Sequence, residues 1–290
     1  MTSRFIPTDI SFSLEVFPPK TTTGLDHLMQ TVDTYASFAP AAITVTFGAA
    51  GAMDQVEHRR DVIRQIRARC DIPVAAHMTC ANRSRAEVDA IVEALVADGV
   101  RHIVALRGDM MGEGAPYRPH PDGYPMTYDY IAAIKKQHPS ICVYVAGYPE
   151  IHPESPSEAH DLDHLKHKVD AGADAVMTQF FFDPEIYLRW RDKVEKRGIH
   201  VPLIPGLLPV IHFPKMCAMA QRCNASVPEF MHTMFDGVEP ESLDHKLLAM
   251  NVLSHQITRL VEHGVTHFHF YTMNETILTR HLCQWMRAGF

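Results

Sequence analysis

Residues 84–106, SRAEVDAIVEALVADGVRHIVAL, contain the unit from which the fold of this 290-residue chain is predicted. Ser84 and Glu87 have the S-x-x-E spacing of a capping box, which marks the start of a helix. Apolar residues then recur at helical spacing, and Gly99 precedes the β-branched run 102–106. A glycine in this place is typical of a helix C-terminus that leads through a short loop into a strand. The segment therefore predicts a helix followed by a buried strand.

The same order of helix, glycine and strand occurs twice more along the chain. Gly172 precedes ADAVMTQFFF, and Gly264 precedes VTHFHFY. Short apolar runs rich in β-branched and aromatic residues predict eight strands, at 11–17, 43–47, 73–78, 102–106, 141–146, 174–181, 202–206 and 267–271. Segments with helical periodicity separate these runs, so strands and helices are expected to alternate throughout.

Eight such units in one chain predict an α/β fold, a single (β/α)8 TIM barrel. A doubly wound sheet is the alternative, but it usually has fewer strands and a glycine-rich nucleotide fingerprint. The interval between the seventh and eighth strands is about sixty-five residues, and extra helices are expected there around 213–222 and 243–262. Because no linker or change of composition is evident, residues 1–290 are expected to form one catalytic barrel domain without a regulatory domain.

Composition favours a globular, cytoplasmic protein. Hydrophobic residues make up 46% and charged residues 21%, which provides enough apolar material for a packed core. The net charge is -7 and no dense basic block occurs, so nucleic acid is not expected as a partner. No apolar stretch is long enough to span a membrane, and the N-terminus lacks the order of a signal peptide, so no membrane partner is expected. The six cysteines contain no C-x-x-C pair and are expected to be reduced.

Polar residues are dense at the predicted strand ends, where a barrel builds its active site. They are Glu15, Thr46, His77, Thr79, Arg107, Asp109, Tyr148, His152, Gln179 and Tyr271. Any one of them could simply cap a loop or form a hydrogen bond in the core. Glu15 and Gln179 argue against that interpretation for the whole set, because they are predicted inside strands of bulky apolar residues. An unpaired polar group there costs about 1–3 kcal/mol.

Several common catalytic motifs are missing from the sequence. It contains no GxxxxGK[ST], GxSxG or GxGxxG motif, so neither a glycine-rich phosphate loop nor a nucleophile elbow is predicted. Asp163, His164 and His167 on one predicted helix have a spacing that could suit a metal ion. A metal-dependent hydrolase would need His and carboxylate ligands from several strand ends, and the first strand offers a single carboxylate. No metal site is therefore predicted.

Nine sequence blocks carry a family resemblance: SFSLEVFPPK, VTFGA, AAHMTC, HIVALRGD, YPEIHPE, DLDHLKHKVDAGAD, TQFFFD, IPGLLPV and FHFYTMN. In this order, over residues 11–274, they resemble the methylenetetrahydrofolate reductase family, flavin enzymes of one-carbon metabolism and methionine biosynthesis. The resemblance implies an oxidoreductase, a flavoprotein that holds FAD, with NADH or NADPH as electron donor. The implied reaction is reduction of 5,10-methylenetetrahydrofolate to 5-methyltetrahydrofolate, or the same reaction run in the oxidative direction. It also implies a small-molecule folate substrate and a homo-oligomer.

The resemblance gives individual residues their expected roles. Glu15 matches the acid that protonates the folate nitrogen as the five-membered ring opens to an iminium. Asp109 matches the acidic residue that stabilises the resulting cation near the flavin, and Gln179 and Tyr271 match substrate-binding positions. The positions implied to contact FAD are Thr46, Ala49, His77, Arg107, Gly108, Asp109, Tyr148, His152, Asp161, His164 and Lys168.

Elementary chemistry agrees with the role implied for Glu15. Opening an aminal ring needs an acid that is still protonated at neutral pH, and the apolar neighbours of Glu15 are expected to raise its pKa by desolvation. Arg107 and Lys168 are expected to supply cations for the FAD pyrophosphate in place of a glycine loop. A metal-dependent barrel hydrolase and a non-catalytic barrel retained for binding are the alternatives.

Some positions depart from the family pattern. Phe47 stands where tyrosine is common, and His164 and His167 stand where the family has Asn and Arg. On the substrate side, Met219 replaces an aromatic residue, Lys215 replaces glutamine, and Glu275 stands where enterobacterial members have arginine. An Arg-to-Glu reversal is expected to change the contacts of an anionic, polyglutamylated folate tail. The insertion at 110–125 has no role that the sequence assigns.

Overall fold

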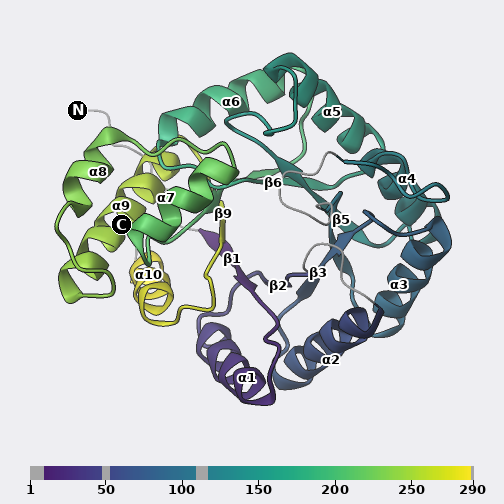
Figure 1. Ribbon diagram of the computed structural model, residues 1–290, viewed down its shortest axis with the longest axis horizontal. Helices are drawn as coiled ribbons and strands as arrows, with labels where there is room; N and C mark the ends of the chain where they lie inside the picture. The colour runs from purple at the N-terminus through teal and green to yellow at the C-terminus, as the bar shows by residue number, and fades with distance from the viewer. Residues whose placement is uncertain (1–9, 48–52, 109–116, 289–290) are drawn as a thin grey trace.

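The structure, a computed structural model, describes residues 10–47, 53–108 and 117–288. Its strands are parallel and form one sheet in the order β7-β6-β5-β4-β3-β2-β1-β9-β8, curled into a barrel (Figure 1). They are β1 (Ser11–Val16), β2 (Ala42–Val45), β3 (Val74–Thr79), β4 (His102–Leu106), β5 (Cys142–Gly147), β6 (Ala175–Thr178), β7 (Leu203–Ile204), β8 (Gly206–Leu207) and β9 (His267–Phe270). The predicted TIM-barrel architecture is confirmed.

Pro205 divides the predicted seventh strand into β7 and β8. Proline has no backbone N–H and cannot donate to a strand ladder. Before Pro205 the chain pairs with β6, and after it the chain pairs with β9. The chain itself therefore closes the barrel between the two ends of the strand order, and the nine strand segments of the described ranges correspond to the eight predicted strands.

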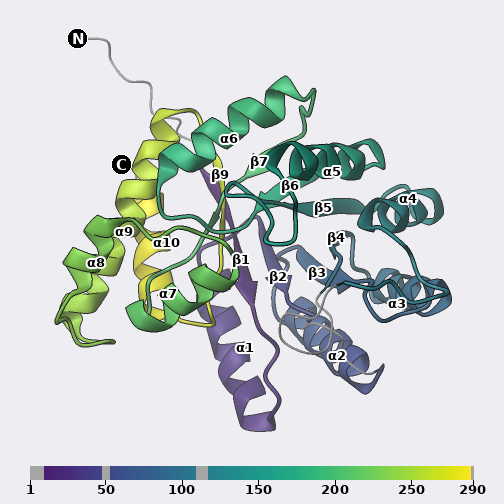
Figure 2. The ribbon, with the colours of Figure 1, turned by 45° about the horizontal axis from the view of Figure 1, so that its top comes forward.

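Helices surround the strands on the outside of the barrel (Figures 1 and 2). They are α1 (Thr22–Ala36), α2 (Met53–Arg69), α3 (Arg85–Ala97), α4 (Thr127–Gln137), α5 (Glu158–Asp170), α6 (Pro184–Lys196), α7 (Phe213–Arg222), α8 (Glu229–Phe235), α9 (Leu243–Glu262) and α10 (Ile277–Ala288). The extra helices predicted near 213–222 and 243–262 are α7 and α9. The sequence did not predict the short α8, which packs against α9 (Figure 2). No helix in the described ranges is both long and apolar enough to span a membrane.

The predicted capping box and helix-terminating glycines occur at the predicted positions. Ser84 and Glu87 form the capping box at the start of α3. Gly99, Gly172 and Gly264 follow α3, α5 and α9 and have φ values of 82°, 112° and 82°. These left-handed conformations let each helix end and turn into the next strand without a Cβ clash.

Successive side chains of β1 point alternately to the apolar core and to the interior of the barrel. Phe12, Leu14 and Val16 are buried in the main apolar core, which the strands share with the surrounding helices. Because successive side chains of a strand point to opposite faces, Ser13 and Glu15 point into the barrel. A second apolar cluster lies beneath α7, α8 and α9 and includes Phe182, Val210, Met216, Met231 and Phe235. Strand β1 thus packs its apolar side chains against the helices and directs its polar side chains into the barrel.

Candidate active site

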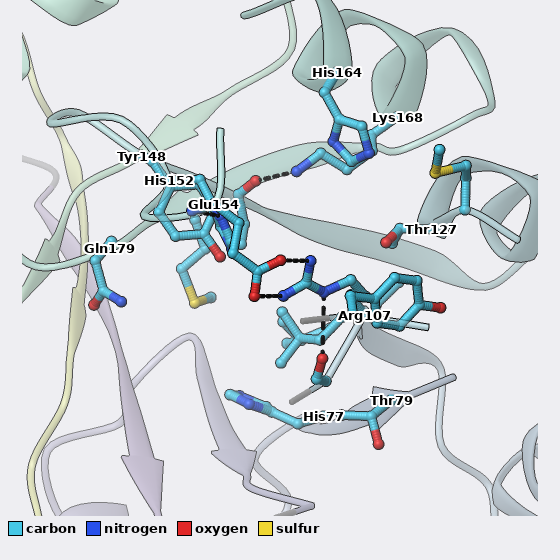
Figure 3. Close-up of a pocket in the computed structure, with 18 of the residues that line it drawn as sticks. His77, Thr79, Arg107, Thr127, Tyr148, His152, Glu154, His164, Lys168 and Gln179 are labelled. Atoms are coloured by element: carbon cyan, nitrogen blue, oxygen red, sulfur yellow. Dashed lines mark hydrogen bonds and ion pairs between the residues drawn. The ribbon is translucent and has the colours of Figure 1, made fainter. Parts of the chain in front are cut away.

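A cavity of about 810 Å³ lies at the carboxyl ends of the strands, within the size range of small-molecule sites (Figure 3). It brings together thirteen residues that the sequence placed at strand ends or matched to the family site, namely Glu15, Thr46, His77, Thr79, Arg107, Gly108, Tyr148, His152, Asp161, His164, Lys168, Gln179 and Tyr271. The two other predicted residues, Ala49 and Asp109, lie outside the described residues.

Glu15 lies on β1 at the floor of the cavity and is only 4% exposed. Its Oε2 is 3.4 Å from His77 Nε2 and 4.0 Å from His269 Nε2. Burial raises the pKa of Glu15, and the smaller influence of His77 lowers it. Burial also lowers the pKa of His77 to about 4 and that of His269 to about 3. The expected rise is therefore present, and the carboxyl group can hold a proton beside two neutral imidazoles.

Arg107, directly after β4, forms a bidentate ion pair with Glu154 from the loop after β5. Nη1 lies 2.5 Å from Oε2 and Nη2 lies 2.9 Å from Oε1, and both bonds are drawn in Figure 3. The guanidinium also lies over the ring of Tyr117, 4.7 Å from its centroid. Fork-to-fork pairing fixes the orientation of an arginine as well as its position. Sequence reasoning missed both partners, although Glu154 is part of the block YPEIHPE.

Gly108 follows Arg107 and passes very close to β3. Its φ is 84°, and a Cβ atom placed on it would lie 2.8 Å from the Cβ of Thr79. A side chain here would meet both backbone strain and a steric clash. The glycine therefore lets the chain turn into the cavity immediately after β4.

Helix α5 provides the basic wall of the cavity. His160, His164 and Lys168 are spaced four residues apart, which places them on one face, and all three line the cavity. Lys168 is buried and its Nζ donates to the carbonyl of Ala146 at 2.5 Å. Burial lowers the pKa of Lys168 to about 8, and nearby Asp161 opposes this shift. The i, i+4 spacing was the signal that could have identified His160.

Two more features of α5 order this wall. Asp161 Oδ2 accepts a hydrogen bond from the backbone N–H of His152 at 3.3 Å, and burial raises the pKa of this carboxyl group. Burial, followed by the nearby cation of Lys168, lowers the pKa of His164 to about 4. Lys168 is therefore charged at neutral pH, whereas the His164 ring is neutral.

Gln179 and Tyr271 line the other side of the cavity, and Figure 3 shows Gln179 across it from Thr127 and Lys168. The prediction that Gln179 lies inside strand 174–181 is wrong, because β6 ends at Thr178. The strand is short because its partner β7 pairs with it at two positions before the break at Pro205. The amide Oε1 of Gln179 accepts from Phe180 N at 3.0 Å, and the Tyr271 hydroxyl donates to Thr178 O at 2.7 Å.

The residues with metal-like spacing on α5 do not converge. Asp163 pairs with Arg197, the residue after α6, and exposed His167 makes an edge contact with Tyr128 at 5.4 Å between ring centroids. Across residues 10–47, 53–108 and 117–288, no group of three or more His, Cys, Asp and Glu side chains is placed to hold a metal ion.

Residues 3–287 match the family model described as methylenetetrahydrofolate reductase. The chain belongs to the methylenetetrahydrofolate reductase family. A relative from Pectobacterium carotovorum, named 5,10-methylenetetrahydrofolate reductase, is 38% identical over 94% of this chain and 89% of its own length. The Escherichia coli K12 protein of the same name is 37% identical over 94% of this chain and 90% of its own length. The family resemblance of the nine sequence blocks is thus confirmed, and the chain is an oxidoreductase of this family.

A solved structure supports the barrel fold of this reductase. It is described as an uncharacterized protein from Clostridium thermocellum that binds two copies of 5-methyl-5,6,7,8-tetrahydrofolic acid. It matches with a TM-score of 0.65 and 12% identity, over 97% of this chain and 96% of that one. At this identity the likeness concerns the fold alone.

The substrate-side departures from the reductase family lie outside the lining of the described cavity. The carboxylate of Glu275 accepts the backbone N–H groups of Ile277 and Leu278, at 2.9 and 2.7 Å, at the start of α10. It therefore caps a helix, a position in which a carboxylate is favoured by free N–H groups and the helix dipole. Lys215 is exposed on α7, and Met219 packs against the second apolar cluster. The residues that line the described cavity include none of these three.

The second half of the 110–125 insertion packs against α3. The Tyr124 hydroxyl donates to Asp89 Oδ1 at 2.7 Å, and Arg85 Nε donates to the carbonyl of Gly123 at 3.1 Å. Tyr117 lines the cavity beneath Arg107. The insertion thus connects a cavity-lining ring to the outer helix layer, whereas residues 110–116 lie outside the described residues.

Proposed function

We propose that this reductase converts 5,10-methylenetetrahydrofolate to 5-methyltetrahydrofolate, with FAD as its cofactor and NADH or NADPH as the electron donor. Family membership supports the reaction class. The observation that carries the proposal for this chain is the carboxyl group of Glu15, which is buried at the floor of the cavity with a raised pKa. A protonated acid in such a place is what the opening of a folate aminal ring requires.

The chemistry of the cavity fits FAD. Its volume suits a large ligand, and Arg107 and the buried Lys168 provide cations for a pyrophosphate. Among the described residues His77 Nε2 has no hydrogen-bond partner, and this buried nitrogen is one of the polar groups available near Glu15. Bound FAD would supply the two-electron carrier between nicotinamide and folate. Thr46, Tyr148, His152, Asp161 and His164 are proposed to complete its binding site, together with Gly108, whose lack of a side chain leaves room beside β3.

The folate is proposed to lie between Glu15 and the side of the cavity that carries Gln179 and Tyr271. Glu15 gives its proton to one of the two substrate nitrogens that the methylene carbon joins. The bond from that nitrogen to the methylene carbon breaks, and the electron pair stays on the nitrogen. The remaining iminium carbon accepts a hydride and becomes the methyl group. Asp109 is proposed to stabilise the cationic intermediate, and Ala49 to contact the cofactor.

The test uses purified protein reconstituted with FAD under anaerobic conditions. We expect a yellow protein whose flavin absorbance is bleached by NADH or NADPH and restored by methylenetetrahydrofolate, with 5-methyltetrahydrofolate as the product. Titration with each nucleotide identifies the preferred donor, and bleaching by 5-methyltetrahydrofolate measures the oxidative direction. Protein that binds no FAD would contradict the proposal and favour the metal-dependent barrel hydrolase. FAD that binds but is bleached by neither nucleotide nor methylfolate would instead favour a non-catalytic barrel.

A further inference from the structure

A pair of polar residues lies inside the barrel next to Glu15. The register of β1 and β9 sets Ser13 beside His269, and Ser13 and Glu15 face the interior while Leu14 faces the helices. Barrel interiors are usually filled by bulky branched apolar side chains. Ser13 is 3% exposed and His269 is fully buried, so both carry a desolvation cost that calls for a function.

The two ring nitrogens of His269 have different neighbours. Its Nδ1 lies 2.9 Å from Ser13 Oγ, whereas its Nε2 has no hydrogen-bond partner in the described structure and lies 4.0 Å from Glu15 Oε2. Ser13 therefore holds one ring nitrogen and directs the other toward the carboxyl group. His77 on β3 approaches the same oxygen from another strand, with its Nε2 at 3.4 Å.

The Ser13 hydroxyl also determines which nitrogen of His269 carries the hydrogen. This hydroxyl has one proton and two acceptors within reach, His269 Nδ1 at 2.9 Å and the Phe268 carbonyl at 3.4 Å. Donation along the shorter contact makes Nδ1 the acceptor, with no hydrogen of its own, whereas donation to the Phe268 carbonyl would leave Oγ to accept from Nδ1–H. Burial keeps the ring neutral, with a pKa of about 3, so in the first arrangement its single N–H is on Nε2, facing Glu15.

We propose that His269, held in this tautomer by Ser13, is a positioning residue for the acid Glu15. This inference rests on the proposed function of the site. At 4.0 Å the Nε2–H of His269 forms no hydrogen bond with Glu15, but its dipole faces Oε2 and favours the acidic proton on Oε1. When that proton passes to the folate nitrogen, the carboxylate left behind attracts the same N–H, and closing the 4.0 Å gap would form a charge-assisted hydrogen bond that stabilises it. No proton leaves His269 in this step.

The groups that face Glu15 from the neighbouring strands are not expected to titrate between pH 5 and 9. His77 comes from β3, His269 and Tyr271 come from β9 and its end, and Thr44 is its β2 neighbour. Both histidines stay neutral above pH 5, since their pKa values are about 4 and about 3. Burial holds the pKa of Tyr271 well above its ordinary value. Between pH 5 and 9 the folate step should therefore report the protonation of Glu15.

The experiment measures the rate at which methylenetetrahydrofolate oxidises the pre-reduced FAD enzyme, as a function of pH. His269→Leu removes the N–H, Ser13→Ala removes control of the tautomer, and His269→Gln keeps an N–H near the Nε2 position as a matched control. Losing a donor to the carboxylate raises its pKa. We expect His269→Leu and Ser13→Ala to move the alkaline limb of the profile up by about one pH unit and to lower the plateau about tenfold, with near-normal behaviour in His269→Gln. The double variant should be no slower than His269→Leu.

An independent readout needs no turnover. The nitrogen chemical shifts of His269 in labelled holoenzyme should show a bare Nδ1 and a protonated Nε2, and Ser13→Ala should disturb this assignment. A protonated Nδ1 in the parent enzyme, or an unshifted alkaline limb in Ser13→Ala and His269→Leu, would overturn the inference. Should His269→Leu fail to fold, Ser13→Ala and the nitrogen shifts decide it. Failure of the proposed function itself is recognised separately. In that case Glu15→Gln would carry out the folate step at the same rate as the parent enzyme.

Discussion

His77 Nε2 lies 3.4 Å from Glu15 Oε2, yet the two side chains form an acid beside a neutral base rather than a salt bridge. Burial raises the pKa of Glu15 and lowers that of His77 to about 4. Both shifts disfavour the charged pair, because each ion would lose its hydration in the barrel. Both shifts favour the neutral pair, in which the carboxyl group holds the proton that a folate nitrogen can receive.

Replacing Glu15 by Gln tests this acid directly. The amide keeps the size of the side chain but cannot donate an acidic proton, so the folate half-reaction should slow by about 10²–10⁴, the usual value of general acid catalysis. Reduction of FAD by the nicotinamide needs no proton from Glu15 and serves as the reference in the same variant. Stopped-flow absorbance separates the two steps. Equal losses in both would point to a structural role for Glu15.

Gly108→Ala should destabilise the protein at the edge of the cavity. The new Cβ would lie 2.8 Å from the Thr79 Cβ and would force a non-glycine residue to a φ of 84°. We expect a loss of about 2–4 kcal/mol, combining a positive-φ penalty of about 1 kcal/mol with overpacking of about 1–3 kcal/mol. Gly237→Ala is the control, because Gly237 has a φ of 67° and no atom of the described part of the chain would lie within 4 Å of the added Cβ. Urea unfolding should give the control the smaller loss, and equal losses would remove the steric part of the argument.

FAD affinity should depend on pH through Lys168. Burial lowers the pKa of its ammonium to about 8 in the free protein, and a bound anionic pyrophosphate would raise it. Below pH 8 the lysine is already charged, so this group adds no pH dependence there. Above pH 8 binding must take up a proton, and affinity should fall by up to about tenfold per pH unit. Flavin fluorescence titration from pH 6 to 10 measures this slope.

The matched control for Lys168 lies two residues away on the same helix. Lys168→Met should bind FAD more weakly at pH 7 and should lose the slope above pH 8. Lys166→Met should keep both, because Lys166 pairs with Asp170 and lies outside the cavity lining. An identical slope in the Lys168 variant would assign the pH dependence to other groups.

Local signals explain how far the sequence predicted this fold. The capping box at Ser84 and the glycines at positions 99, 172 and 264 depend on interactions within a few residues, so the sequence alone determines them. The division of the seventh strand was not predicted, although Pro205 was visible. A proline at the end of an apolar run is compatible with an intact edge strand, and its effect depends on pairing with β6 and β9.

The site shows the same limit. Polar residues at strand ends and the family blocks identified thirteen of the 26 residues that line the cavity, because a barrel brings its strand ends together. The pairing of Arg107 with Glu154 joins two loops 47 residues apart, and no local pattern reveals such a partner. Ser13 and His269, which lie 256 residues apart, meet only through the register of β1 and β9. Glu275 was interpreted from its charge, whereas its hydrogen bonds to α10 determine its position.

Glu275→Arg distinguishes the helix cap from a role in folate binding. Arginine cannot accept the N–H groups of Ile277 and Leu278, and it places a cation at the positive end of α10. We expect a loss of about 1–3 kcal/mol in unfolding free energy, about half of that in Glu275→Gln, and near-complete recovery in Glu275→Asp. Glu195→Arg makes the same change of charge at an exposed site in the last turn of α6 and should cost little. If Glu275 is a cap, the ratio of KM values for monoglutamyl and polyglutamyl folates should be the same in Glu275→Arg as in the parent. If the arginine variant instead bound polyglutamyl folate several-fold more tightly with unchanged stability, Glu275 would belong to the substrate site and the cap would be incidental.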